Sequence, residues 1–179
     1  LVPFAEYFPV PAAVRSWLRL MSLPYSDFTA GSARQPPLPA GGLLLDPSIC
    51  YEDAYGSAQL YSAGRSDLLV NVTNDAWFGR SPARYQHLQI GRMRAIEVGR
   101  YLLRAANDGV SAIIGPKGQL LASAPEYQAA VLRGTVVAHR GLSPYLRLGN
   151  WPVLLLALAA LALAVWRRRA QAGIAGKVT

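Results

Sequence analysis

Apolar residues over most of the chain fall into short blocks separated by turn residues. Residues 42–50 and 66–75 are aliphatic runs of strand length, and we expect the second to be a strand covered on both faces. Residues 82–106 show the clearest helical periodicity. The predicted buried side of this helix consists of Leu88, Met93, Ala95, Ile96, Tyr101 and Leu102. Alternating strands and helices predict an α/β fold, with helices on the outer face of a sheet.

Further segments complete the predicted order of elements. Residues 54–64 read as a helix or turn, residues 109–125 as a β-hairpin around the turn GPKG, and residues 128–139 as a final strand. Residues 9–42 contain nine Pro or Gly, which predicts a loop-rich connection with one short helix at 11–22.

One uncharged stretch, residues 148–166, stands apart from this pattern. As a helix its nineteen residues cover roughly 28 Å, close to the ~30 Å of a bilayer core. Its seven Leu and two Val contribute on the order of −3 to −5 kcal/mol toward insertion. A buried core helix is the alternative, but such helices usually keep a polar face. We expect a transmembrane helix.

The ends of this stretch predict its orientation. Trp151 and Trp166 suit the two membrane interfaces, and the arginines at 167–169 favour a cytoplasmic C-terminus by the positive-inside rule. The predicted organisation is a globular domain at 1–147 outside the cytoplasm, a membrane helix at 148–166 and a basic cytoplasmic tail at 167–179.

Composition and charge exclude several classes. The chain is 52% hydrophobic and 16% charged, which excludes a disordered protein. Its formal net charge is +8, but apart from the arginines at 167–169 the basic residues are scattered and accompany no nucleic-acid-binding motif, so we expect no nucleic acid partner. The chain has a single cysteine, Cys50, and therefore no internal disulfide.

Cys50, in the stretch SICYEDAYG, has two possible roles. A free cysteine is often a buried small hydrophobe, and that alternative stays open. Its place at the end of a predicted strand favours a nucleophile, because such a turn presents a side chain above the sheet edge, close to backbone N–H groups that can stabilise an oxyanion. Polar neighbours support this: Ser48, Tyr51, Glu52 and Asp53.

A nucleophilic thiol needs a base or a cation, because its ordinary pKa is about 8.5. The acids beside Cys50 work against the thiolate. Lys117 lies in the predicted hairpin turn and Lys177 in the tail. His87 and His139 are possible bases, but a structural role is favoured for both. From the residues alone the base is unassigned.

Five segments in order resemble the C-terminal third of the bacterial apolipoprotein N-acyltransferase family, whose members are inner-membrane proteins with a periplasmic nitrilase-type (carbon-nitrogen hydrolase) domain. These segments are LVPFAEYFP, ICYEDAYG, NVTNDAWFG, QHLQIGRMRAIEVGRYLLRAANDGVSAIIGPKG and GLSPYLRLGNWP. The resemblance covers essentially the whole chain. It implies the C-terminal half of an αββα sandwich followed by one membrane helix.

The resemblance also implies residue roles. Cys50 matches the nucleophile of a Glu-Lys-Cys triad, which takes an acyl chain from a phospholipid as a thioester and passes it to the N-terminal amine of a diacylglyceryl-cysteine lipoprotein. Glu6, preceded here by Ala5 where the family commonly has Gly, matches a glutamate that supports the triad. Tyr51 and Glu52 match positions important for activity.

The NDAWFG motif adds three implied site residues, Asn74, Trp77 and Phe78, in a loop suited to acyl chains or to the membrane surface. In the family the triad lysine and the triad glutamate lie upstream of the residue matching Leu1, so neither is assigned within residues 1–179, and we expect these residues alone to be inactive. We expect no metal or cofactor, and a monomer. Two alternatives stay open: a membrane-tethered amidase that hydrolyses small amides, and a non-enzymatic membrane-anchored module with a buried Cys50.

Overall fold

One six-stranded sheet forms the centre of the structure. The computed structural model describes residues 34–175 without a break, together with residues 6, 10, 11, 13, 14, 16, 17, 28, 29, 31 and 32. The strands follow one another in the sheet in the order of the sequence. Their bounds are β1 (Leu38–Ala40), β2 (Leu43–Ile49), β3 (Leu68–Asn74), β4 (Leu102–Asn107), β5 (Ala112–Ile114) and β6 (Leu120–Ser123). Strands β2, β3 and β4 are parallel, and the other pairs are antiparallel.

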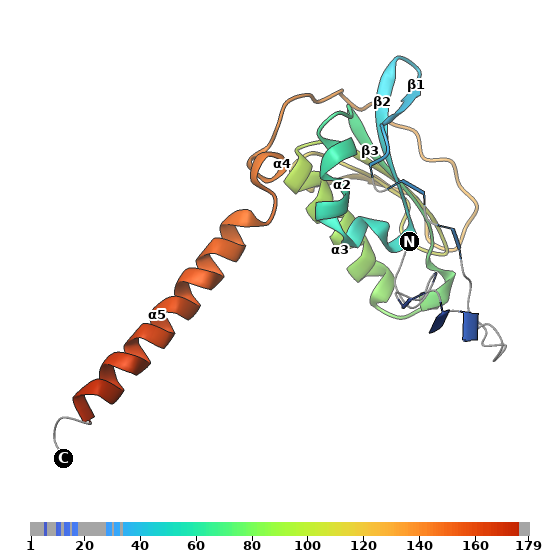
Figure 1. Ribbon diagram of the computed structural model, residues 1–179. Coiled ribbons are helices and arrows are strands. Elements are labelled where there is room, and N and C mark those ends of the chain that lie inside the picture. The colour runs from blue at the N-terminus through green and yellow to red at the C-terminus, as the bar shows by residue number, and fades with distance from the viewer. Residues whose placement is uncertain are drawn as a thin grey trace.

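Two helices, α2 (Gly56–Ala63) and α3 (Ala83–Val98), lie on one face of the sheet (Figure 1). The hydrophobic core lies between them and the strands. It consists of Ala63, Leu69, Leu88, Ala95, Val98, Leu102, Val110, Ala112 and Ile114. The predicted α/β class is confirmed, with one helical layer on a mixed sheet.

Strand β2 ends directly before Cys50, as the sequence predicts, and α2 leads away as expected. Strand β3 is paired on both sides, but it is not covered on both faces along its whole length, because Val72 near its end is 46% exposed. The short strand β1 was not predicted. It pairs with β2 across Gly41 and Gly42, whose positive φ angles of 57° and 79° form the turn.

The predicted helix at 82–106 is too long. Helix α3 ends at Val98, and Gly99 (φ 69°) caps it in the left-handed conformation, which glycine adopts without a steric penalty. Residues 102–107 form β4 instead, paired in parallel with β3. Leu88 and Ala95 are buried as expected, whereas Met93 and Ile96 are about half exposed.

The predicted hairpin is confirmed as β5 and β6, joined by the GPKG turn, in which the N–H of Gly118 donates to the carbonyl of Gly115. The predicted strand at 128–139 is wrong. Those residues form no strand and belong to a long strap between β6 and residue 142, which passes around the side of the sheet away from α2 and α3 (Figure 1). Its far end is anchored where the N–H of His139 donates to the carbonyl of Asp67.

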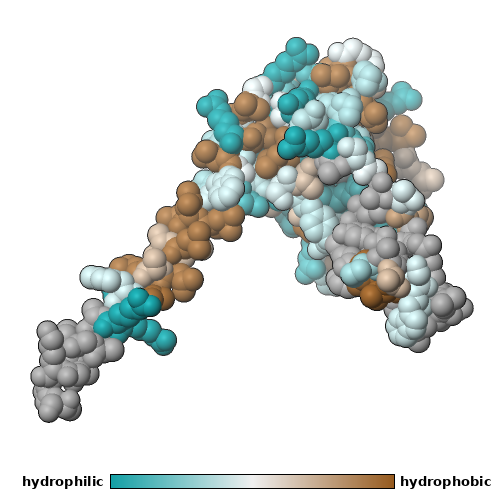
Figure 2. Space-filling view, viewed as in Figure 1, coloured by the Kyte–Doolittle hydropathy of each residue, from teal (hydrophilic) through white to brown (hydrophobic). Residues whose placement is uncertain are grey.

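The chain ends in two helices, α4 (Pro144–Leu148) and α5 (Trp151–Ala175). Helix α5 projects from the domain as a single rod (Figure 1), and its apolar side chains form a continuous exposed surface that ends at the polar arginines (Figure 2). Residues 151–169 are long and apolar enough to cross a membrane. Helix α5 begins three residues after the start of the predicted segment 148–166, because Leu148 still belongs to α4 and a turn precedes Trp151. That this segment spans a membrane stays a prediction.

In the N-terminal part, residues 13, 14, 16 and 17 of the predicted helix at 11–22 are helical and residue 11 is not. The remaining positions of that prediction lie outside the described residues.

Candidate active site

Cys50 occupies a strained turn at the carboxyl end of β2. Its φ of 51° places it in the left-handed region, where a side chain with a Cβ is unfavourable, and it opens the short 3-10 helix Cys50–Ala54. Its side chain is partly exposed. The sharp change of direction predicted at this strand end is therefore present.

The backbone carbonyl of Cys50 points inward, toward two polar side chains. The Nδ2 of Asn71 on β3 lies 3.1 Å from this oxygen, and the Nε2 of His87 on α3 lies 3.3 Å from it. Asn71 and His87 are 0% and 1% exposed. The nucleophile candidate thus lies directly above a buried polar layer.

That layer is a cluster of charged side chains from four elements. His87 contacts Asp75 through Nδ1 at 2.8 Å and Asp53 through Nε2 at 3.2 Å. The guanidinium of Arg104 donates to Asp75 at 3.0 Å, to Asn71 at 2.6 Å and, more weakly, to Asp53 at 3.4 Å. Two acids face two bases, so the cluster is close to neutral when all four are charged. Such compensation is what lets charges remain buried.

Burial and hydrogen bonding oppose each other at His87. Burial disfavours the charged ring, but the hydrogen bonds to Asp53 and Asp75 outweigh it and raise the pKa of His87 to about 9. Burial likewise opposes ionisation of Asp75, yet the bonds from His87 and the charge of Arg104 hold the pKa of Asp75 below its ordinary value. At neutral pH His87 is an imidazolium with both nitrogens engaged, so it cannot accept the proton of Cys50.

Glu52 and Tyr51 flank the nucleophile candidate in different ways. The carboxylate of Glu52 accepts the N–H of Ile49 at 2.8 Å, which ties the start of the 3-10 helix back to the strand end. Tyr51 is 40% exposed, and its ring centroid lies 5.8 Å from that of His87 and 6.2 Å from that of Tyr55.

The NDAWFG loop follows β3, next to β2 in the sheet. Asn74 accepts the N–H of Ala76 at 3.1 Å, capping the short helix Asp75–Phe78, and also accepts from the side chain of Asn107 at 3.2 Å. The Trp77 side chain is 86% exposed, whereas Phe78 is half-buried with its ring edge-on to His87, 6.0 Å between centroids. The structure therefore brings Phe78 and Tyr51 together around His87 and leaves Trp77 in solvent.

Glu6 is half-buried, and its carbonyl accepts the N–H of Phe28. Its supporting role stays a prediction.

Three residues below Cys50 were not identified from the sequence as part of the site: Asn71, Asp75 and Arg104. Asp53 was noted only as a polar neighbour of Cys50, and His87 only as a possible base. A signal was available for two of them, because Asn71 and Arg104 are single polar residues within otherwise apolar strand segments, LLVNV and LLRAA. A lone polar residue on the buried face of a strand requires a partner. Among the described residues, no three potential ligands are grouped as a metal site requires.

Comparison with known proteins places this geometry in a family. The profile of the carbon-nitrogen hydrolase family matches residues 8–141, three quarters of the chain. The chain belongs to the carbon-nitrogen hydrolase family. Among curated members, apolipoprotein N-acyltransferase from Azotobacter vinelandii is 46% identical over 176 residues, 98% of this chain. The enzyme of that name from Chromobacterium violaceum is 46% identical over 174 residues, 96% of this chain.

The carbon-nitrogen hydrolase chain described here spans about a third of the length of these relatives, 34% of each. Solved structures with partial similarity include the C. elegans NitFhit protein, with 24% identity, 70% of this chain and 31% of that chain covered, and a TM-score of 0.48. An amidase from Nesterenkonia sp. shows 25% identity over 73% of this chain and 49% of that chain, also with a TM-score of 0.48.

Proposed function

We propose that this chain carries the nucleophile of an apolipoprotein N-acyltransferase, with Cys50 forming a thioester during lipoprotein maturation. The observation that carries this proposal is the 46% identity, over nearly the whole chain, to curated enzymes of that name. The strained strand-end position of the one cysteine supports it. The proposed substrates are those that the motif resemblance implies: a phospholipid as acyl donor and a diacylglyceryl-cysteine lipoprotein as acceptor.

In the first step the Cys50 thiolate attacks the ester carbonyl of the phospholipid. The resulting tetrahedral intermediate carries an oxyanion, and its collapse breaks the ester C–O bond to leave an acyl thioester. The departing alkoxide takes a proton and leaves as a lysophospholipid. His87 is not the group that handles these protons, because both of its ring nitrogens face acceptors in the buried cluster.

The backbone around Cys50 supplies a donor for the oxyanion. The peptide between Cys50 and Tyr51 is planar and trans, so its N–H points opposite to its carbonyl. Since the carbonyl faces inward to Asn71 and His87, the N–H of Tyr51 faces outward. It lies at the start of a helix, where an N–H has no partner within the helix. A donor one residue after the nucleophile is the arrangement of other strand-end sites.

In the second step the α-amine of the lipoprotein cysteine attacks the thioester. An amide forms, the carbon–sulfur bond breaks, and the amine gives up a proton while Cys50 returns as the thiolate. A thioester suits this transfer because it divides one difficult acyl exchange into two easier steps. Water must be kept out, and Phe78 and Tyr51 are the aromatic groups nearest to the cluster under Cys50.

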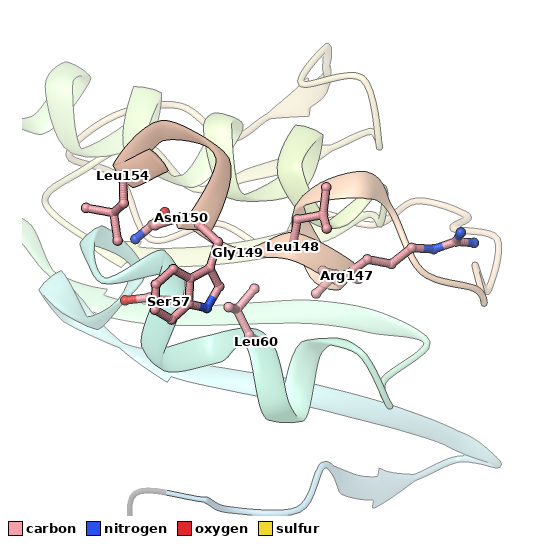
Figure 3. A pocket seen from close by; sticks show the side chains of 9 residues that line it. Ser57, Leu60, Arg147, Leu148, Gly149, Asn150 and Leu154 are labelled. Carbon is pink, nitrogen blue, oxygen red and sulfur yellow. The ribbon is translucent and has the colours of Figure 1, made fainter. Parts of the chain in front are cut away.

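Helix α5 holds this chemistry at the bilayer in the proposed arrangement. The proposed topology has the domain in the periplasm, α5 across the inner membrane and Arg167–Arg169 on the cytoplasmic side, following the positive-inside rule. At the domain end of α5 lies a pocket of about 350 Å³ between α2, α4 and α5 (Figure 3). Leu60, Leu148 and Leu154 line it beside Trp151, and Arg147 extends away from it, a mixture suited to the membrane interface.

The proposal is tested by trapping the intermediate. The complete gene product containing residues 1–179 is incubated with a phospholipid that carries a labelled acyl chain, and intact mass spectrometry is read without acceptor. We expect one added acyl group on Cys50, released by hydroxylamine, and none in Cys50→Ala. The matched control is Lys117→Gln in the exposed hairpin turn, which should keep full labelling. An unlabelled Cys50, or lipoprotein acylation that continues in Cys50→Ala, refutes the proposal.

A further inference from the structure

The backbone of Cys50 needs external support to keep its conformation. A non-glycine residue at a φ of 51° is disfavoured, and such strain persists only where the surroundings over-determine it. The Cys50 carbonyl contacts the side chains of Asn71 and His87, which come from different elements and are nearly fully buried. Support of this kind acts on the backbone of the nucleophile and leaves its sulfur free.

We propose that Asn71 and His87 form a two-donor clamp on the Cys50 carbonyl, positioning both the Cys50 thiol and the Tyr51 N–H for acyl transfer. This inference rests on the proposed function for its reaction. It assigns a positioning role to Asn71 and His87, which touch no reacting atom. Through the planar peptide, a rotation of the Cys50 carbonyl away from the clamp turns the Tyr51 N–H by the same angle.

The contact between Arg104 and Asn71 shows that Asn71 donates to this carbonyl. Arg104 has only donor groups, and its Nη1 lies 2.6 Å from the Oδ1 of Asn71. The amide oxygen of Asn71 must therefore face Arg104, so the NH₂ group faces Cys50 at 3.1 Å and the hydroxyl of Ser48 at 3.0 Å. Arg104 thus fixes the orientation of the first donor.

The second donor follows from the same reasoning. The Nδ1 of His87 faces a carboxylate oxygen of Asp75, and its Nε2 faces a carboxylate oxygen of Asp53 together with the carbonyl of Cys50. Every partner is an acceptor when the acids are ionised, so both ring nitrogens carry hydrogen and the ring is an imidazolium. The charged groups facing it are Asp53, Asp75 and Arg104, while the rings of Tyr51 and Phe78 pack around it.

This arrangement makes the clamp sensitive to alkaline pH. When His87 loses a proton, one of its two nitrogens becomes an acceptor, and either Asp75 or the Cys50 carbonyl loses its donor. The rate of thioester formation should then fall above pH 9 or so, where His87 titrates.

The test compares His87→Gln, His87→Leu and Asn71→Leu with the complete wild-type gene product. The glutamine amide keeps one donor and does not titrate, whereas leucine keeps none. Activity is expressed per Cys50 that reacts with iodoacetamide in the fraction that elutes as folded protein in size-exclusion chromatography, so that unfolded protein does not count. We expect kcat to fall about 10-fold in His87→Gln and about 100-fold in both leucine variants, with KM within about twofold of the wild type, since a small misplacement of a reacting group costs on this scale.

Thr73→Val is the matched control, because Thr73 donates to Asp75 at 3.0 Å and is not one of the two donors to the Cys50 carbonyl. It perturbs the same buried cluster and should keep kcat per reactive Cys50 within about twofold. The alkaline fall in rate should be present in the wild type and in Thr73→Val, and absent from His87→Gln.

The clamp is overturned if the leucine variants keep their kcat per reactive Cys50, or if His87→Gln retains the alkaline fall. If the wild type forms no acyl thioester, the proposed function fails by itself. The clamp is then judged by the ratio of the Cys50 alkylation rates in the wild type and in His87→Gln at each pH, and this ratio should change above about pH 9, where His87 titrates. An alkylation profile identical in wild type and His87→Gln contradicts the clamp whatever the substrate is.

Discussion

The cluster under Cys50 and helix α5 invert the usual distribution of polar and apolar groups. Under Cys50, Asp75, His87 and Arg104 are 0%, 1% and 3% exposed. Along α5, Leu154 and Leu156 are 50% and 71% exposed, within the apolar surface seen in Figure 2. The charged side chains of this cluster are therefore buried, while the leucines of α5 are exposed.

The difference shows that each region is matched to its own surroundings. The buried charges are compensated by one another, two acids against two bases, with hydrogen bonds that satisfy most of their polar atoms. The exposed leucines require an apolar solvent, because a contiguous apolar surface of this kind in water is a liability. We expect the first region to be held by pairing and the second by a bilayer, so different changes should break them.

Removing one partner from the buried cluster should have the largest effect. Arg104→Leu leaves the carboxylates of Asp53 and Asp75 with His87 as their one remaining buried cation. We expect the free energy of unfolding to fall by about 3–5 kcal/mol, as for other broken buried pairs. Urea unfolding in detergent measures it. Arg133→Leu, at an exposed position of the strap, should change stability by less than about 0.5 kcal/mol. An equal fall in the free energy of unfolding for the two variants would show that the buried charges do not depend on one another for compensation.

A charge in the middle of α5 tests the other side of the comparison. Leu158→Arg should cost about 3 kcal/mol in membrane insertion, because a guanidinium at the bilayer centre must be desolvated or drag water with it. The measurement is the fraction of protein that remains in membranes after carbonate extraction. Leu158→Val keeps the position apolar and serves as the control. If both variants extract equally, α5 is not the membrane anchor.

The buried acid Asp46 should make the stability of the fold depend on pH. Its hydrogen-bond partner, the Ser62 hydroxyl, carries no charge that would compensate the carboxylate. Burial raises the pKa of Asp46 to about 6 from an ordinary 3.8, against weaker opposing effects of the Ser62 hydroxyl and Arg100. The folded state therefore binds this proton more tightly than the unfolded state, and stability is lost as pH rises through 6. Asp46→Asn should be more stable than the wild type by on the order of 1–3 kcal/mol at pH 8, and about equal at pH 4. Thermal unfolding at the two pH values measures this, and a pH-independent difference would contradict it.

Replacing Trp77 should have the smallest effect of these variants, and it should act on KM alone. Because it is 86% exposed, Trp77→Ala should alter the melting temperature little. If its ring contacts lipid, KM for a phospholipid in vesicles should rise by roughly fivefold, the equivalent of about 1 kcal/mol, with kcat kept. Val131→Ala, at an 83% exposed position of the strap, is the comparison variant. An unchanged KM would assign Trp77 no part in substrate contact.

Local patterns were sufficient for several elements. The aliphatic runs predicted β2 and β3, and with them the placement of Cys50 at a strand end. The GPKG turn predicted the hairpin of β5 and β6. The predictions failed where a local apolar pattern was compatible with two kinds of secondary structure or with none. Residues 99–107 continue an apolar periodicity, but Gly99 ends the helix and pairing with β3 makes the remainder a strand.

The predicted strand at 128–139 failed for a related reason. Its valines suit a strand, yet a strand forms only where a neighbouring edge accepts its backbone hydrogen bonds. Here the chain crosses the side of the sheet and is fastened at its far end to Asp67.

The sequence by itself determined the identity of the nucleophile candidate, the apolar span and the family, because these depend on residues close together in the chain. The cluster that holds the Cys50 carbonyl was decided by tertiary structure. Asp53 and Arg104 are 51 positions apart, and Cys50 and His87 are 37 apart. The parallel register Ser48–Asn71–Arg104 across β2, β3 and β4 brings their side chains to one face, where α3 adds His87. Charge compensation between such distant residues has no local signature, because it exists only after the sheet has aligned them.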